Sequence, residues 1–190
     1  MVYLGIVLLL LVIIAPIFSL LPSARQKQQM ALRRMGMAEG IRVDLTQVED
    51  PDPDPAAYVS NTGKPLPRII KVAAYRLPRP RPNNWRDLPR CNWQIGRCKN
   101  ASTGELPDGW VYLQPLHEAT SEAMKDFLGR ALPTLPDDVI VVEEETYVVS
   151  VYWREIGGED ALRQVLAFMK ACVQVAPLDL NPLKDSRLDS

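Results

Sequence analysis

An uncharged apolar stretch at the start of the chain, from Val2 to Leu21, constrains this protein more than any other feature of its sequence. A helix of about 20 apolar residues, rising about 1.5 Å per residue, matches the bilayer hydrocarbon thickness of about 30 Å. A cleaved signal peptide is the competing interpretation. However, no basic residue precedes the stretch, the stretch is long for a signal core, and Pro22-Ser23-Ala24 is a poor cleavage site. The stretch therefore predicts an uncleaved transmembrane helix over residues 1–21.

Four basic residues follow this stretch, and no Lys or Arg precedes it; they are Arg25, Lys27, Arg33 and Arg34. The positive-inside rule, which counts Lys and Arg within about 15–20 residues of a span, predicts an N-terminus outside and a cytoplasmic C-terminal domain. This topology describes a single-pass protein of a bacterial inner (plasma) membrane. Residues 22–40 are predicted to form a basic juxtamembrane helix. The low and odd number of cysteines, three, fits a reducing compartment.

Charge is strongly segregated along a chain whose net charge is only −1. Residues 64–99 carry ten Lys or Arg against a single acid, Asp87, whereas residues 100–190 carry seven Lys or Arg against sixteen Asp or Glu. The basic residues are densest in a Pro/Arg-rich loop, residues 76–90, whose prolines keep the backbone extended. Because the whole chain is near neutral and its second half is acidic, nucleic acid is disfavoured as a partner.

The candidate interaction surface combines the basic residues of 22–40 with those of loop 76–90 and one tryptophan. Its members are Arg25, Lys27, Arg33, Arg34, Arg76, Arg79, Arg81, Trp85, Arg86 and Arg90. Such residues can bind anionic lipid headgroups, an aromatic groove of a partner that accepts polyproline segments, or single-stranded nucleic acid. The alternative is an ordinary charged loop whose arginines pair with the acidic half of the same domain.

The remaining pattern predicts an α+β domain over residues 41–178. Apolar alternation predicts strands over residues 41–48, 69–75, 110–113, 139–142 and 146–154. Amphipathic spacing predicts helices over residues 119–132 and 159–175, and residues 143–145 are predicted to form a polar turn. The fold class expected is α+β: one N-terminal transmembrane helix, then a small antiparallel sheet packed against two or three helices. Residues 179–190 are predicted to be a tail.

Residue patterns that carry chemistry are scarce in this chain. His117 is the only histidine, and the six residues between Cys91 and Cys98 do not match the spacing of a zinc knuckle. The acidic loop 49–55 lacks the spacing and glycine of an EF-hand, and Cys172 is expected to be a core thiol. No P-loop, dinucleotide-binding, nucleophile-elbow or zinc-protease motif is present. No catalytic, cofactor-binding or metal-binding residue and no cofactor is therefore predicted, and enzyme activity is disfavoured.

Residues 22–29, PSARQKQQ, followed by residues 40–43, resemble in plan the YajC family of accessory subunits of the bacterial Sec translocon. That family has one span, then a basic arm rich in Arg, Lys and Gln, then a strand. The resemblance covers the first 45 residues, under a quarter of the chain, and it implies an accessory role beside a membrane complex. The chain also looks like other small single-span inner-membrane proteins of Gram-negative bacteria.

These observations predict a membrane-anchored, non-enzymatic protein whose α+β domain binds other membrane or cytoplasmic proteins. The membrane contact would be the stretch from Val2 to Leu21, which would hold the domain near its partner and raise the effective concentration. The alternative function is sensing of anionic lipid or of a ligand at the membrane surface. A hydrolase or another enzyme is the third candidate.

Overall fold

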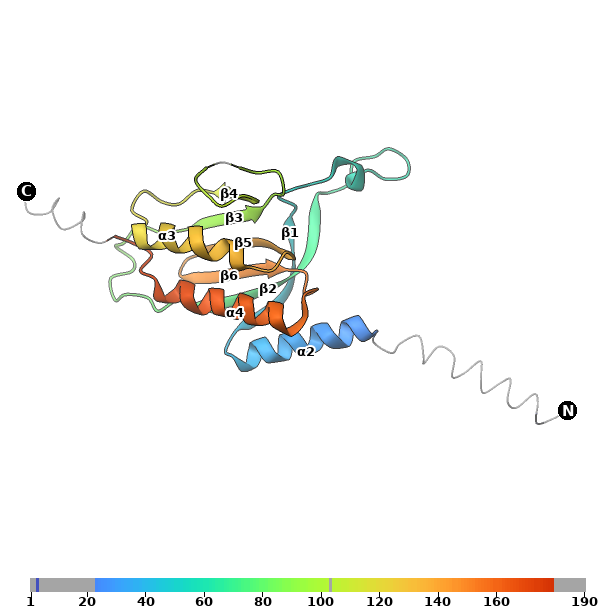
Figure 1. The fold of residues 1–190 in the computed structure, drawn as a ribbon, viewed down its shortest axis with the longest axis horizontal. Helices are drawn as coiled ribbons and strands as arrows, with labels where there is room; N and C mark the ends of the chain where they lie inside the picture. The colour runs from blue at the N-terminus through green and yellow to red at the C-terminus, as the bar shows by residue number, and fades with distance from the viewer. Residues whose placement is uncertain (1–2, 4–22, 103, 180–190) are drawn as a thin grey trace, which may run out of the picture.

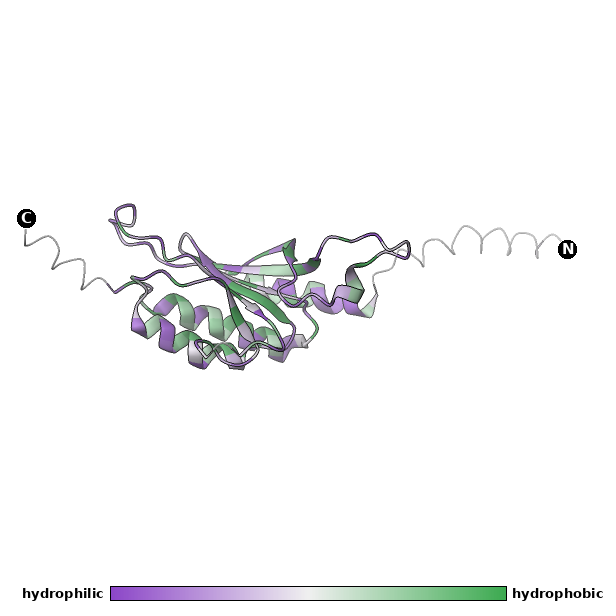
Figure 2. Ribbon diagram, turned by 90° about the horizontal axis from the view of Figure 1, so that it is seen from above, coloured by the Kyte–Doolittle hydropathy of each residue, from purple (hydrophilic) through white to green (hydrophobic). Residues whose placement is uncertain are grey.

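The computed structural model describes residues 3, 23–102 and 104–179, which form two layers, a sheet and a set of helices (Figure 1). In chain order the elements are α2 (Ala24–Ala38), β1 (Arg42–Glu49), η1 (Pro55–Tyr58), β2 (Ile69–Pro78), β3 (Trp93–Arg97), β4 (Trp110–Gln114), α3 (Glu122–Ala131), η2 (Leu132–Thr134), β5 (Val139–Glu145), β6 (Val148–Trp153) and α4 (Gly158–Gln174). The three α-helices lie on one face of the sheet (Figures 1 and 2).

All strand pairs in the six-stranded sheet are antiparallel, and the strand order is β1-β2-β6-β5-β3-β4. β5 and β6 form a hairpin whose two turn residues, Thr146 and Tyr147, have φ values of 48° and 64°. Two successive residues with positive φ are typical of the type I′ turn, whose twist matches that of a hairpin. In the strand order, β5 and β6 lie at the centre of the sheet, and β1 and β4 are its two edges.

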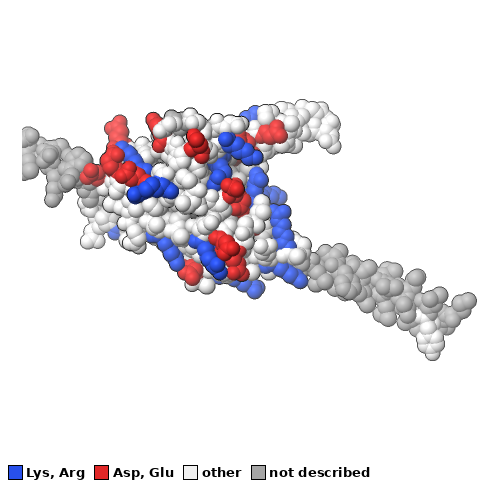
Figure 3. All heavy atoms as spheres, viewed as in Figure 1, with Lys and Arg blue, Asp and Glu red and all other residues white. Residues whose placement is uncertain are grey.

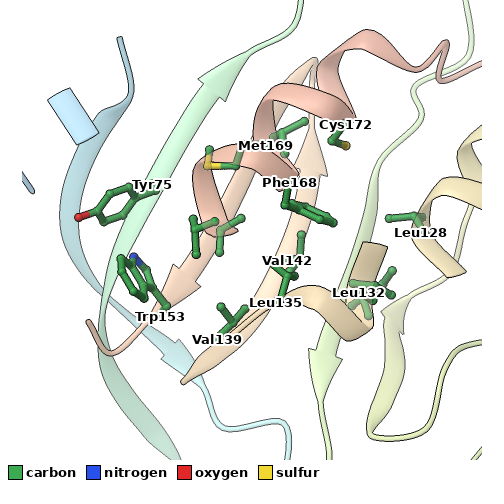
Figure 4. Packing of buried hydrophobic residues seen from close by; sticks show 14 of the residues in the cluster. Tyr75, Leu128, Leu132, Leu135, Val139, Val142, Trp153, Phe168, Met169 and Cys172 are labelled. Atoms are coloured by element: carbon green, nitrogen blue, oxygen red, sulfur yellow. The ribbon is translucent and has the colours of Figure 1, made fainter. Parts of the chain in front are cut away.

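The main core lies between the sheet and the helices, because each contributes one apolar face. Figure 4 shows Trp153, Val142 and Met169 among the side chains that meet there. The large side chains of Trp93 and Trp110 are also fully buried. Burial of apolar surface in such a layer supplies most of the favourable free energy of folding, at roughly 25 cal/mol per Å².

None of the described α-helices covers the opposite face of the sheet, which holds a smaller cluster, Val72, Ala74, Val141 and Tyr152. A polar row crosses this face beside the cluster. Asp44 accepts a hydrogen bond of 2.6 Å from Arg76, Tyr152 donates to Glu143, and the Gln94 side chain donates to Glu143 at 2.9 Å. Burial and the neighbouring Glu143 carboxylate raise the pKa of Tyr152. The row links five strands through side chains, which explains why polar residues are tolerated in these strands.

No helix in the described part of the chain is long and apolar enough to cross a membrane. This finding overturns the transmembrane helix in the predicted fold class, and with it the single-pass topology and the inner-membrane localisation. The described helices are amphipathic: each buries one face and keeps charged residues on the other, such as Arg163 and Lys170 of α4. A charge at the centre of a bilayer costs about 2.5–3.5 kcal/mol, so such helices pack on a sheet instead. The span predicted from Val2 to Leu21 lies, apart from Tyr3, outside the described residues.

Candidate functional site

The ten residues of the predicted interaction surface lie in two separate regions, α2 and the segment from the end of β2 to the start of β3. On α2, Arg25, Lys27 and Arg34 are exposed. Arg33 is instead held by Glu155, whose two carboxylate oxygens each accept a hydrogen bond of 3.0 Å from its Nε. The four basic residues of α2 therefore do not act as one surface.

In the segment after β2, two arginines of the predicted surface lie against the ring of its tryptophan, Trp85. The guanidinium groups of Arg81 and Arg86 lie 5.0 and 5.5 Å from the ring centre of Trp85. Trp85 in turn meets Tyr147 edge to face, with ring centres 6.4 Å apart. Arg90 is exposed beside them. These cation–π contacts are worth about 0.5–1 kcal/mol each at exposed sites, so they order the loop and leave its charge on the surface.

Arg79 is not on a surface at all. It is 6% exposed, and it forms a two-pronged ion pair with the carboxylate of Glu144, with N–O distances of 2.6 and 2.9 Å. Its remaining donors bind backbone carbonyls at the end of α4, those of Cys172, Val173 and Val175. A cation here also complements the negative end of the helix dipole. Glu144, predicted to lie in a turn, is thus an interior residue of β5.

Among the described residues, no strand lies beside the outer edge of β1. The register pairs Glu49 with Ile69, and one step further the Asp50 N–H donates to the Arg68 carbonyl at 2.8 Å. Because hydrogen-bonded and non-bonded pairs alternate in an antiparallel ladder, the even-numbered residues of β1 bond to β2. The N–H and C=O groups of Val43, Leu45 and Gln47 therefore point outward. None of the described residues bonds to these outward groups.

Three features that commonly protect an edge strand are missing from β1. It contains no proline, its register with β2 is unbroken, and its mid-strand side chains on the helix side, Leu45 and Gln47, are uncharged. Leu45 is 68% exposed. The opposite edge differs, because β4 has only five residues, its register with β3 shifts, and Pro115 follows it. β1 is therefore the edge at which another strand can add.

A cleft of about 340 Å³ adjoins this edge on the helix side of the sheet. Leu45 and Gln47 of β1 line it where it meets the edge. α2 contributes Gln29 and Arg33, and Trp153 at the end of β6 also lines it. The cleft exists because α2 covers only part of the sheet: its buried residues are confined to Leu32 and Gly36 in its C-terminal half. Side chains of an added strand that point to the helix side would face this cleft.

Glu155 lines the same cleft and is 3% exposed. Its backbone φ is 55°, an uncommon left-handed conformation for a residue other than glycine. Its carboxylate accepts the Arg33 hydrogen bonds and a further one of 3.1 Å from the Tyr75 hydroxyl. Burial, together with the nearby Glu155 charge, raises the pKa of Tyr75 strongly, and the Glu155 hydrogen bond raises that of Arg33. The carboxylate is thus fully engaged in joining α2 to the β6–α4 connection.

Two other cations line the cleft without such a partner. Lys71 and Arg154 are exposed, and neither forms an ion pair with any residue that the structure describes. With Arg33 neutralised by Glu155, Lys71 leaves the cleft positively charged, whereas Arg154 also lines a second hollow with Asp50, Asp52, Asp137 and Asp138. Figure 3 shows Lys and Arg side chains gathered along the side of the molecule where α2 begins.

The other residues considered from the sequence are not brought together. His117 is exposed, and its Nδ1 accepts a hydrogen bond from the Ala119 N–H. The thiol of Cys98 donates to Asp52 and that of Cys91 to the Pro177 carbonyl, at sulfur–oxygen distances of 3.5 and 3.6 Å. In the described part of the chain, no three His, Cys, Asp or Glu residues are grouped as metal ligands.

Comparison of the chain with models of protein families, with curated proteins and with solved structures finds no match. None of these comparisons bears on the resemblance to the YajC family, which stays a prediction. The fold and the surface of the protein itself therefore carry the functional argument.

Proposed function

We propose that this chain is a protein-interaction module that receives an extended segment of a partner protein beside β1. The outward edge of β1, unprotected at Val43, Leu45 and Gln47, is the observation that carries the proposal. In strand addition, main-chain hydrogen bonds provide affinity, and pockets for alternate side chains provide specificity. The cleft of about 340 Å³ adjoins the edge at Leu45 and Gln47. The open main-chain edge and this cleft both support the proposal.

An enzymatic role finds less support in the same region. The cleft has one carboxylate, Glu155, and it is already bound by Arg33 and Tyr75. A general acid or base needs a proton that it can exchange with substrate, at a pKa near the working pH. The raised pKa of Tyr75 disfavours that hydroxyl as a base as well.

Gln47→Pro tests the proposal, because the Gln47 N–H points outward. Proline removes this donor and places its ring in the path of an added strand, while every β1–β2 hydrogen bond is kept. Gln47→Val is the matched control, since it changes the side chain and retains the N–H. Peptides are first selected from a random phage-displayed library on the full chain. Their affinities for the parent and both variants are then measured by fluorescence anisotropy.

We expect Gln47→Pro to weaken binding of the selected peptides by at least about tenfold, equivalent to about 1.4 kcal/mol, and Gln47→Val to change it by less than about threefold. Thermal unfolding of each variant verifies that β1 still folds. Equal binding to the parent and to Gln47→Pro would overturn the proposal, and so would a library that yields no binding peptide.

A further inference from the structure

We infer that the segment received by β1 is acidic, with a carboxylate that lies over the cleft beside Lys71. This inference rests on the proposed function, and it names the chemistry of the partner. Lys71 is exposed and lines the cleft, and it forms no ion pair within the described residues.

The strand register places Lys71 within reach of an added strand. Gln47 and Lys71 are directly opposite each other, so their side chains share the helix side of the sheet. A partner residue opposite Gln47 would point to the same side. Neighbouring strands are about 4.8 Å apart, so this residue would lie about 10 Å from Lys71, backbone to backbone. The combined lengths of a lysine and a glutamate side chain span this distance.

The charge of the cleft favours an acid at that position. The carboxylate of Glu155 is occupied by Arg33, which leaves Lys71 as the cation of the cleft without an acidic partner among the described residues. An acidic side chain gains from its positive potential, and a basic one is repelled by it.

A second copy of this chain does not provide the missing carboxylate. In an antiparallel pairing of β1 with its copy, the outward, odd-numbered residues face one another. In every register that pairs most of β1, the residue opposite Gln47 is Val43, Leu45 or Gln47 of the copy. None of these is acidic, so self-pairing places no carboxylate opposite Gln47. A segment of a different protein fits the edge better.

Lys71→Glu tests the inference, with Lys64→Glu as its control. Lys64 is an exposed residue in the excursion between β1 and β2, it does not line the cleft, and its substitution changes the net charge equally. The probes are the library-selected peptides and synthetic versions in which each Glu or Asp is replaced by Gln or Asn. Affinities for the parent and both variants are measured at low and at high salt.

We expect the selected peptides to be enriched in Glu or Asp at one alternate position. Replacing that acid by its amide should weaken binding to the parent about fivefold, and Lys71→Glu should weaken binding of the acidic peptide about tenfold, with both effects smaller at high salt. Lys64→Glu should change binding by less than about twofold, as expected of a distant exposed charge.

The remaining outcomes distinguish failure of the acidic-partner inference from failure of the proposed function. If the peptides bind Gln47→Pro poorly, yet show no acidic preference and no effect of Lys71→Glu, the edge function stands and the acidic partner is overturned. If they bind Gln47→Pro normally, the proposed function itself fails. If sedimentation velocity shows a dimer of the parent that Gln47→Pro dissociates, the occupant of the edge is a second copy, and the inference is overturned.

Discussion

Arg79 joins three parts of the chain that are distant in sequence: the end of β2, the strand β5 and the end of α4. Its guanidinium binds the Glu144 carboxylate of β5 and the backbone carbonyls of Cys172 and Val173 at the end of α4. Both charges are almost completely buried. A buried ion pair depends on full hydrogen bonding to offset the loss of hydration, and here the guanidinium has that bonding.

Arg79→Ala should lower the free energy of unfolding by about 3–5 kcal/mol, because it leaves the Glu144 charge buried without its partner. Arg81→Ala, an exposed arginine two residues on, should lower it by no more than about 1 kcal/mol, the value of its cation–π contact with Trp85. Urea unfolding followed by circular dichroism measures both. The double variant Arg79→Met, Glu144→Leu should recover part of the loss, since it leaves no buried charge. Equal stability of the two single variants would show that the ion pair has no net stabilising role.

Among the helices, α2 depends on a close approach to the sheet. A Cβ added at Gly36 would lie 2.7 Å from a ring carbon of Tyr75, so only glycine permits this contact. The Arg33–Glu155 pair and the Glu39–Lys170 pair then attach the same helix to the β6–α4 connection and to α4. The position of α2, and therefore one wall of the cleft, is set by these contacts.

Gly36→Ala should destabilise the protein although alanine is the better helix former. The steric cost of overpacking, about 1–3 kcal/mol, exceeds the propensity gain of about 1 kcal/mol. Gly129→Ala in α3 is the control, because a Cβ there meets nothing within 4 Å. That variant should gain up to about 1 kcal/mol. Thermal unfolding measures both, and a stabilised Gly36→Ala would show that α2 is not packed against Tyr75.

At the scale of the whole molecule, burial raises the pKa of several groups that lose a proton at high pH. They are Tyr75, Tyr112, Tyr147, Tyr152, Cys91 and Cys172. For Cys172 the pKa rises from its ordinary value near 9 to about 12. A raised pKa means that the folded state holds the proton more tightly than the unfolded state does. The stability that this provides is complete below the unfolded pKa and is lost as the pH rises toward the folded one.

The free energy of unfolding should therefore fall as the pH rises above about 9, by up to about 1.4 kcal/mol per pH unit for each such group. Cys172→Val, which removes one ionisable group and nearly keeps its volume, should make this fall less steep between pH 9 and about 12. Urea unfolding at a series of pH values measures the slope. The same slope in parent and variant would show that the thiol is not held protonated by the fold.

Part of the fold could be predicted from the sequence because it depends on local periodicity. The helices predicted over residues 119–132 and 159–175 correspond to α3 and α4, since a helix that buries one face shows it in its spacing. No strand was predicted over β3, because its apolar alternation is limited to Trp93 and Ile95 before Gly96 and Arg97 end it. Residues 143–145 were predicted to form a turn because three successive glutamates are unusual in a strand. In the structure Gln94 and Tyr152 donate hydrogen bonds to Glu143, and Arg79 neutralises Glu144.

The candidate site was beyond the reach of sequence alone. Its central observation is that, among the described strands, β1 pairs with β2 alone, and strand order is decided by which distant segments pair. The residues of the predicted basic surface were separated because several of them bind partners that are distant in the sequence. Arg79 entered the core, Arg33 bound Glu155, and Arg76 bound Asp44, so partners more than thirty residues apart decided their roles.

By itself, the sequence determined the α+β alternation of the domain, the faces of its two C-terminal helices and the segregation of its charge, because each is a property of neighbouring residues. Hydropathy of one stretch also led to a membrane assignment that the described helices contradict. The tertiary structure alone decided that α2 packs against Tyr75, that β1 is an open edge and that a positively charged cleft adjoins it. These features depend on contacts between segments that are distant in the sequence, and local residue patterns do not predict such contacts.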